Sequence, residues 1–233
     1  MAAKSKDTVV ATTVDGTEIS RHDLESLIRK PGVKSQPWLN DEIVNGIMAA
    51  IVGRKLEQTG WAKGSKTAPA YAYLPSMWYS NYQKPGGVNN IASWTRRRGI
   101  KGAKLLEAEK VFFPVNTGVH WMLLIISPQA RTIEFLDSFN FGLHSKAWMF
   151  QIAREWLAME LEGKYVAEEW TELASESCPQ SNSDDCGAFT CFNALAAGKG
   201  LGFEAVGGGH MADARKMLAA VLVNGGFKGD FEL

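Results

Sequence analysis

The feature that most constrains this chain is Trp121 to Ile126, a run of six residues that are all apolar. Val111 to Val115 precedes the run, and Thr132 to Leu136 follows it after a turn over Pro128 to Arg131. All three segments have the composition and length of β-strands. A strand that is apolar at every position is typically buried on both faces of its sheet. The run therefore predicts an interior strand that a hairpin joins to the next strand.

Helices are predicted on both sides of these strands along the sequence. Asn40 can cap a helix whose apolar residues follow helical spacing up to Leu56, and Gly60 can end it. Ser20 can cap a shorter helix through about Arg29. The other expected elements are helices at Met77–Tyr82, Ile91–Arg98, Ser145–Leu161, Cys186–Ala197 and Met211–Val223, and a strand near Tyr165–Glu172. This mixture predicts a flexible segment at residues 1–16 and one α+β domain at residues 17–233.

The bulk composition excludes several classes of function. Lys and Arg number 25 and balance 25 Asp and Glu, so no overall charge attracts nucleic acid or an anionic membrane. The apolar runs are far shorter than the roughly 20 residues of a membrane-spanning helix. The three cysteines match no zinc-binding spacing, and the four histidines are scattered. We expect no metal, no cofactor, no nucleic-acid or membrane partner, and a monomer in the nucleus or cytoplasm, where cysteines stay reduced.

The hairpin brings a histidine and an aspartate together. If its turn is centred between Pro128 and Gln129, His120 and Asp137 face each other, with Cβ atoms about 4.5–5.5 Å apart. If the centre shifts by one residue, they become diagonal neighbours on the same face. A carboxylate there can fix the tautomer of the imidazole and stabilise its charged form. The spacing predicts a base with its orienting acid, although two strand-end residues can also meet by chance.

Cys186 begins a predicted helix, because apolar residues on one helical face follow it in GAFTCFNALAAG. A helix N-terminus favours the thiolate, which is the reactive form. The negative charge of Asp185 opposes the thiolate unless its side chain caps backbone N–H groups. Gly187 leaves room for a substrate backbone to approach. We interpret Cys191, on the core face, and Cys178, in a loop, as structural residues.

Three segments resemble a known family, and they occur in the order PWLNDEIVNGIM, HWMLLIISPQARTIEFLDS and CPQSNSDDCGAFTC. The family is that of the ubiquitin-like-protein proteases, which includes the SUMO-specific (sentrin) proteases and the related deneddylase. The resemblance extends from about Val14 to Gly225. It implies an α+β, papain-like cysteine protease fold of the ubiquitin-like-protease type, with a central mixed sheet flanked by helices. It also implies a thiol protease that cleaves after the C-terminal Gly-Gly of a modifier, with SUMO and its conjugates as the favoured partners.

The same resemblance implies roles for individual residues. Cys186 is similar to the nucleophile of the family, His120 to its base and Asp137 to the acid that orients the base. Gln180 resembles the side-chain donor of the oxyanion hole, beside the backbone N–H of Cys186. An ordinary loop glutamine is the simpler interpretation of Gln180 when the family is set aside.

Further positions resemble the surface that binds the modifier. Trp38 and Trp121 are similar to the walls of a narrow tunnel for the Gly-Gly tail, and Asp41 to a residue that contacts a basic side chain of the modifier. Trp38 could instead be a hydrophobic staple before its helix. Residues 61–90, which help to select the modifier in this family, align poorly. Arg96 to Arg98 fit the negative end of a helix dipole, and a basic patch for an acidic partner is the alternative.

Three other functions compete with SUMO cleavage. The first keeps the chemistry and changes the modifier, as in a deneddylase or a ubiquitin-cleaving relative. The second is acyl transfer by an enzyme similar to the YopJ-type acetyltransferases, which gives no reason for Trp38 and Gln180. The third is a binding module without catalysis, which has no need of a nucleophile.

Overall fold

A five-stranded mixed sheet forms the centre of the computed structural model, which describes residues 5–30, 32–140, 146–205 and 207–229. The strand order is β3-β4-β5-β6-β7. Strand β5 (Trp121–Ser127) lies in the middle and pairs antiparallel with β4 (Lys110–Asn116) and β6 (Thr132–Leu136). The outer strands β3 (Tyr71–Tyr73) and β7 (Thr171–Leu173) run parallel to their neighbours. The apolar run therefore forms the interior strand that the sequence predicts.

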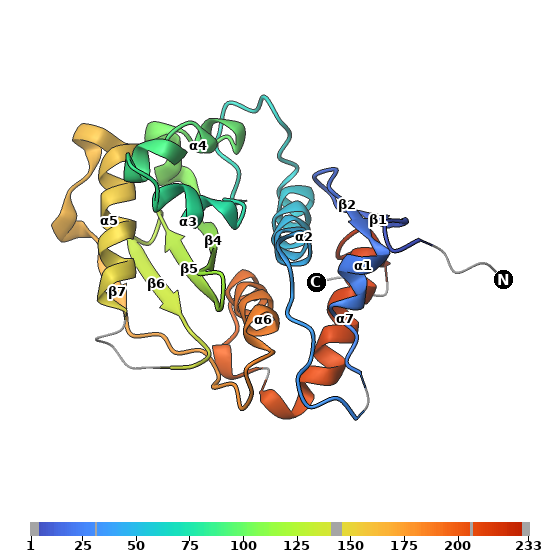
Figure 1. The fold of residues 1–233 in the computed structure, drawn as a ribbon. Coiled ribbons are helices and arrows are strands. Elements are labelled where there is room, and N and C mark those ends of the chain that lie inside the picture. The colour runs from blue at the N-terminus through green and yellow to red at the C-terminus, as the bar shows by residue number, and fades with distance from the viewer. Residues whose placement is uncertain (1–4, 31, 141–145, 206, 230–233) are drawn as a thin grey trace.

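Helices cover both faces of this sheet, as Figure 1 shows. Helices α2 (Asp41–Thr59), α6 (Cys186–Lys199) and α7 (Met211–Val223) belong to one side, where Leu123 and Ile125 enter their core cluster. Helices α3 (Met77–Tyr82) and α5 (Ala147–Leu161) pack on the other side against Leu124 and Ile126. Alternate residues of β5 thus enter two separate cores, which explains why its first six positions, Trp121 to Ile126, are all apolar.

Local capping fixes where the helices begin and end. The Asn40 side chain accepts a hydrogen bond from the Ile43 N–H at 3.2 Å, and Gly60 ends α2 with a left-handed φ of 65°. Ser20 and Asp23 form a capping box at α1 (Arg21–Glu25). Helix α4 spans Trp94–Arg97. Single 3₁₀ turns lie at Gly87–Ile91, Gly102–Glu107, Glu162–Lys164, Ala167–Glu169, Phe203–Ala205 and Gly208–His210.

Several local features differ from the sequence prediction. The strand predicted near Tyr165–Glu172 is confined to β7, after a 3₁₀ turn at Ala167–Glu169, and the helix predicted at Ile91–Arg98 is reduced to α4. Helix α1 ends at Glu25 rather than near Arg29, because the N–H groups of Ser26, Leu27 and Ile28 bond to carbonyls three residues back rather than four. Helix α6 continues past Ala197 to Gly200, whose φ of 67° ends it. A strand, β1 (Val9–Thr12), lies within residues 1–16 and pairs with β2 (Glu18–Ser20), where the sequence predicted none. The residues of β1 are mostly exposed, so no apolar alternation marks it.

None of the helices in the described part of the chain combines the length and the apolar character needed to cross a membrane.

Candidate active site

The β5–β6 hairpin places His120 and Asp137 in direct contact. Leu123 pairs with Leu136 and Ser127 with Thr132, so the turn is centred one residue beyond the first of the two predicted positions. His120 and Asp137 are therefore diagonal neighbours on one face, which is the second predicted alternative. His120 Nε2 lies 2.7 Å from Asp137 Oδ1, and both side chains are nearly buried. The hairpin alone thus delivers an imidazole with an oriented carboxylate.

Phe139 completes this arrangement, although its role could not be predicted from the sequence with the turn centred between Pro128 and Gln129. In the observed register, Phe139 is the position directly opposite His120, and the two ring centroids are 4.5 Å apart. The Phe139 backbone N–H donates to Asp137 Oδ1 at 2.9 Å, so the carboxylate is held by two partners. The position of the turn centre decides which side chain lies opposite His120. The correct turn centre would therefore have identified Phe139.

The charge of His120 depends on its two neighbours. Burial by itself lowers the pKa of the imidazole, but the hydrogen bond with Asp137 and the electrostatic interaction with Cys186 outweigh it and raise the pKa from 6.5 to about 9. Because Asp137 holds Nε2, Nδ1 is the nitrogen left for the thiol. The geometry therefore favours an imidazolium beside the sulfur of Cys186, held in one orientation by Asp137.

Cys186 is the first residue of α6, and it is buried with a relative exposure of 1%. The first bond of the helix runs from the Phe189 N–H to the Asp185 carbonyl at 2.9 Å. The N–H groups before Phe189 therefore point out of the helix end, where they favour negative charge. The sequence prediction of Cys186 at a helix N-terminus agrees with this placement.

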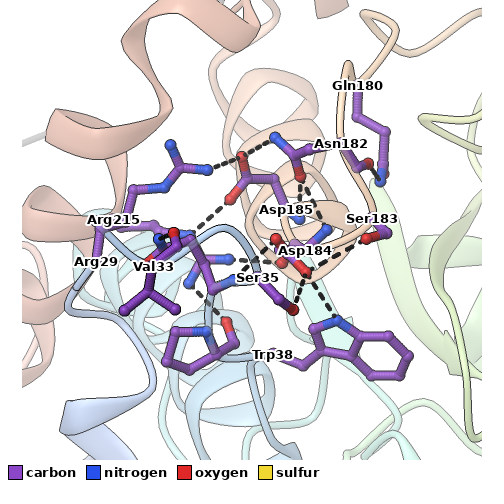
Figure 2. Close-up of polar contacts among 12 residues, drawn as sticks. Arg29, Val33, Ser35, Trp38, Gln180, Asn182, Ser183, Asp184, Asp185 and Arg215 are labelled. Carbon is purple, nitrogen blue, oxygen red and sulfur yellow. Dashed lines mark hydrogen bonds and ion pairs between the residues drawn. The ribbon is translucent and has the colours of Figure 1, made fainter. Parts of the chain in front are cut away.

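The side chain of Asp185 does not cap the backbone N–H groups of α6, so capping is not what offsets its negative charge. Its carboxylate instead accepts hydrogen bonds from Arg215 Nε at 2.8 Å, from Arg29 at 2.8 Å and from Asn182 Nδ2 at 2.7 Å (Figure 2). Two guanidinium groups thus balance the carboxylate that lies beside Cys186. Neither arginine was identified from the sequence, because their distances along the chain from Asp185 leave no local pattern.

Of the two predicted tunnel tryptophans, Trp38 lies in the segment that leads into α2, and Trp121, at the start of β5, contacts the same segment. Trp38 is 45% exposed, whereas Trp121 is 3% exposed and donates its indole N–H to the Leu39 carbonyl at 3.0 Å. A Cβ atom on Gly187 would lie 2.9 Å from Leu39 Cβ and 3.3 Å from Trp121 Cδ1. Gly187 therefore leaves room for the protein's own side chains, and not for a substrate backbone as the sequence suggested.

Gln180 lies in the loop before α6, close to the end of β6. Its backbone N–H donates to the Ser138 carbonyl at 2.8 Å, and its side-chain oxygen accepts from the Ser138 hydroxyl. Its amide nitrogen donates to the Asn182 carbonyl. The structure thus places Gln180 beside the residue that follows Asp137, with its amide donor bound inside the loop.

Asp41 lies in the exposed first turn of α2, on the Trp38 side of the site. Its carboxylate accepts hydrogen bonds from the Ser76 hydroxyl at 2.9 Å and from Asn116 Nδ2 at 3.4 Å. Ser76 immediately precedes α3, so Asp41 joins α2 to the segment 61–90 that aligned poorly. Because the Asp41 carboxylate is held at the surface, it can still form an ion pair with a basic side chain of another protein.

The other cysteines lie away from this chemistry. Burial raises the pKa of the Cys191 thiol well above its usual value, and its side chain packs in the α6 core. Cys178 is partly buried and packs against the same cluster. Both placements agree with a structural interpretation, which leaves Cys186 as the thiol beside an imidazole.

The three arginines at the end of α4, Arg96 to Arg98, have different environments. Arg98 stacks on the Tyr73 ring, with 4.2 Å from its guanidinium carbon to the ring centroid, and lies 3.8 Å from Asp15. Arg96 and Arg97 are exposed and line a cavity of about 510 Å³ with Trp61 and Lys104. This cavity lies on the α4 side of the molecule, away from the N-terminus of α6 (Figure 1).

Fold and site together define the class of papain-like cysteine proteases, in which a thiol at a helix N-terminus faces a histidine that a polar side chain orients. The chain belongs to the Ulp1 protease family, whose C-terminal catalytic domain matches residues 38–219. This confirms the family and the α+β fold with a central mixed sheet that the sequence predicted.

Individual relatives agree with this assignment. The chain is 31% identical over 180 residues to human "Sentrin-specific protease 2", which covers 74% of this chain and 27% of the relative. It is 28% identical to "Ubiquitin-like-specific protease 1" of Saccharomyces cerevisiae, over 83% of this chain and 28% of the relative. The chain therefore spans little more than a quarter of the length of these proteins.

Solved structures show the same fold. The catalytic domain of a Ulp1-like SUMO protease from Chaetomium thermophilum superposes with a TM-score of 0.87 and 28% identity, covering 98% of this chain and 87% of that one. The yeast Ulp1 protease domain, solved in complex with Smt3, the yeast ortholog of SUMO, gives a TM-score of 0.76 at 21% identity, over 96% and 90% of the two chains.

Proposed function

We propose that this chain is a thiol protease that cleaves after the C-terminal Gly-Gly of a ubiquitin-like modifier, with SUMO as the preferred modifier. The observation that carries the proposal is the 2.7 Å contact between His120 Nε2 and Asp137 Oδ1, in a site whose imidazole also interacts with Cys186 at the start of α6. Both precursor processing and removal of SUMO from its conjugates break a carbonyl–nitrogen bond after this glycine.

The chemistry follows from the positions of the three side chains. His120 takes the proton of Cys186 through Nδ1, while Asp137 holds Nε2 and stabilises the imidazolium. The thiolate attacks the carbonyl carbon of the terminal glycine, and the bond to the leaving amine breaks as the imidazolium returns the proton. Water then hydrolyses the thioester, with His120 as the base, and restores the thiol.

The negative oxygen formed in each step needs hydrogen-bond donors. The backbone N–H of Cys186 lies at the N-terminus of α6, where it favours an anion. Gln180 can supply a second donor once its amide nitrogen leaves the Asn182 carbonyl, which it binds in the free enzyme. We therefore assign Gln180 to the oxyanion hole as a group that changes partner when the substrate binds.

The binding side of the proposal uses Trp38, Trp121 and Asp41. Trp38 and Trp121 both lie at the segment that packs on Gly187, next to Cys186, and glycine is the residue whose backbone would fit a narrow passage between their indoles. Asp41 is exposed beside this entrance and can pair with a basic residue of the modifier. SUMO is preferred to the neddylation modifier and to ubiquitin because the relatives described above carry the names of sentrin and SUMO proteases.

The cellular setting of the proposal is the nucleus or the cytoplasm. All three cysteines are free thiols, as a reducing compartment requires. The catalytic mechanism needs a reduced Cys186, so the proposed activity and the proposed location support each other.

The test offers SUMO, the neddylation modifier and ubiquitin, each with an electrophile in place of its C-terminal carboxylate, to the purified protein. SUMO should label Cys186 fastest, as intact-mass analysis and peptide mapping will measure, and Cys186→Ser should not be labelled. Asp41→Lys should slow the labelling by weakening docking.

If the neddylation modifier or ubiquitin labels Cys186 faster than SUMO does, that modifier and not SUMO is the preferred substrate. No labelling by any of them, together with acetyl transfer from acetyl-CoA, would contradict the protease function itself.

A further inference from the structure

The carboxylate of Asp184, two residues before the nucleophile, reaches across to the loop that carries Trp38. It accepts hydrogen bonds from the backbone N–H of Gln36 at 2.9 Å and from the indole N–H of Trp38 at 3.3 Å. The hydroxyls of Ser35 and Ser183 lie at 3.3 and 3.4 Å. Asp184 is only 4% exposed, so its charge is directed at this loop and not at solvent (Figure 2).

The backbone of Asp184 is fixed from the opposite side. Its carbonyl accepts a hydrogen bond from Arg215 at 2.6 Å, and its N–H donates to Asn182 Oδ1 at 2.8 Å. Arg215 is fully buried in α7 and also donates to the Pro37 carbonyl at 3.0 Å. Asp184 and Arg215 therefore form one brace, which holds the backbone of the Trp38 loop at Gln36 and Pro37 and the side chain of Trp38 at its indole N–H.

Trp38 would be mobile without this brace. Its side chain is 45% exposed, and the loop before it is held mainly through polar contacts. Burial by itself raises the pKa of Asp184, but the hydrogen bonds from Gln36 and Trp38 outweigh it and hold the pKa below its usual value. The carboxylate is thus ionised at neutral pH and forms a charge-assisted bond to the indole.

We infer that Asp184 is a positioning residue for substrate selection, which fixes the indole of Trp38 as a rigid wall next to Cys186. This inference rests on the proposed function, in which the modifier's tail passes between Trp38 and Trp121. A rigid wall admits glycine and rejects a side chain, because a single added methyl group must displace the indole. A free indole would swing away and admit the larger residue.

The variants separate the brace from general stability. Asp184→Asn keeps the shape of the side chain but replaces one carboxylate oxygen by an NH₂ group. This group cannot accept the hydrogen bonds that Gln36 and Trp38 donate. Trp38→Phe keeps an aromatic wall and loses the N–H that Asp184 holds, and its exposed position preserves folding. Asp213→Asn, on the exposed face of α7, makes the same chemical change away from the site and is the matched control.

Two measurements decide the inference. The first is cleavage of a SUMO precursor with its Gly-Gly tail, compared with a precursor in which the first glycine of the pair is alanine. One added methyl group changes such rates by about 10- to 200-fold. Asp184→Asn and Trp38→Phe should both lower this preference by about tenfold, the order of one hydrogen bond to a charged group, mainly through a lower KM for the alanine precursor. Asp213→Asn should leave it unchanged.

The second measurement needs no activity. The Trp38 indole N–H, assigned by NMR through its loss in Trp38→Phe, should exchange with solvent slowly in the wild type and about tenfold faster in Asp184→Asn. Fast exchange in the wild type would overturn the brace, whether or not Asp184→Asn folds. An unchanged tail preference in Trp38→Phe would overturn its role in selection. If the wild type cleaves neither precursor, the proposed function is contradicted, and with it the role of Asp184 in selection. The exchange rates would still show whether Asp184 holds the Trp38 indole.

Discussion

Gly187→Ala tests how closely the helix of the nucleophile must approach its neighbours. The new Cβ would lie 2.9 Å from Leu39 Cβ and 3.3 Å from Trp121 Cδ1. Carbon atoms pack at about 3.5–4.0 Å, so the N-terminus of α6 must move by about 0.6–1.1 Å relative to Leu39. Leu39 Cβ is attached to the backbone and cannot rotate away, and the indole of Trp121 is held by the Leu39 carbonyl.

Such a shift has separate consequences for stability and for catalysis. Overpacking costs about 1–3 kcal/mol of unfolding free energy, and the replacement of a helical glycine by alanine restores about 0.5–1 kcal/mol. Displacing a nucleophile by about 1 Å can lower the rate about 100-fold. We therefore expect a folded variant with slightly reduced stability and a loss of kcat/KM of about 100-fold.

The assay combines urea unfolding with cleavage kinetics on a SUMO precursor. Gly53→Ala is the matched control, because a Cβ atom there would lie 2.8 Å from Val14 Cγ2, in the middle of α2 and away from Cys186. It should lose similar stability and keep its kcat/KM. If Gly187→Ala retains wild-type kcat/KM, or if Gly53→Ala loses as much activity, the steric reasoning is refuted.

Other predictions concern the triad, the oxyanion hole and the thiols. Asp137→Asn should fold and lose up to about 10⁴-fold in kcat, because the imidazole loses its fixed tautomer. The pKa of His120 is raised from 6.5 to about 9, so the wild type should have a larger free energy of unfolding than this variant. The difference should be complete below about pH 6.5 and should disappear as the pH rises through about 9. Urea unfolding at several pH values will measure it. Gln180→Ala should lower kcat by about 100-fold and change KM little; an unchanged kcat in steady-state assays would remove Gln180 from the oxyanion hole. Cys186→Ser should abolish turnover and still bind the modifier in calorimetry, whereas Cys191→Ala should stay active and lose about 1 kcal/mol of stability.

Elements with strong local signals could be predicted from the sequence. Helices at Met77–Tyr82 and Met211–Val223 have the expected bounds, and Asn40 and Gly60 delimit α2 as predicted. The hairpin could be predicted because an apolar run, a turn and a second strand follow one another directly. In each case the residues that decide the element lie within a few positions of it.

Features that depend on distant partners could not be predicted. Strand β3 (Tyr71–Tyr73) has only three residues, and it forms because it pairs in parallel with β4, which lies almost 40 positions further on. Arg215 lies between buried residues of α7, where helical periodicity predicts an apolar side chain, and it is fully buried. Its partners lie in three other segments of the chain. The apolar pattern of one helix contains no information about such a buried charge.

The buried arginine explains why a thiolate can exist next to Asp185. Two carboxylates lie close to the reacting groups, and each has its own cation. Asp137 faces the imidazolium of His120, while Asp185 is balanced by Arg215 and Arg29. With both carboxylates balanced, the thiolate of Cys186 faces the imidazolium and the N-terminus of α6, and both of these stabilise negative charge. Helix α7 supplies Arg215 from the end of the chain. Arg215 of α7 is thus one of the two guanidinium groups that balance the carboxylate beside Cys186, and the sheet with the three proposed catalytic side chains would leave this carboxylate to Arg29 alone.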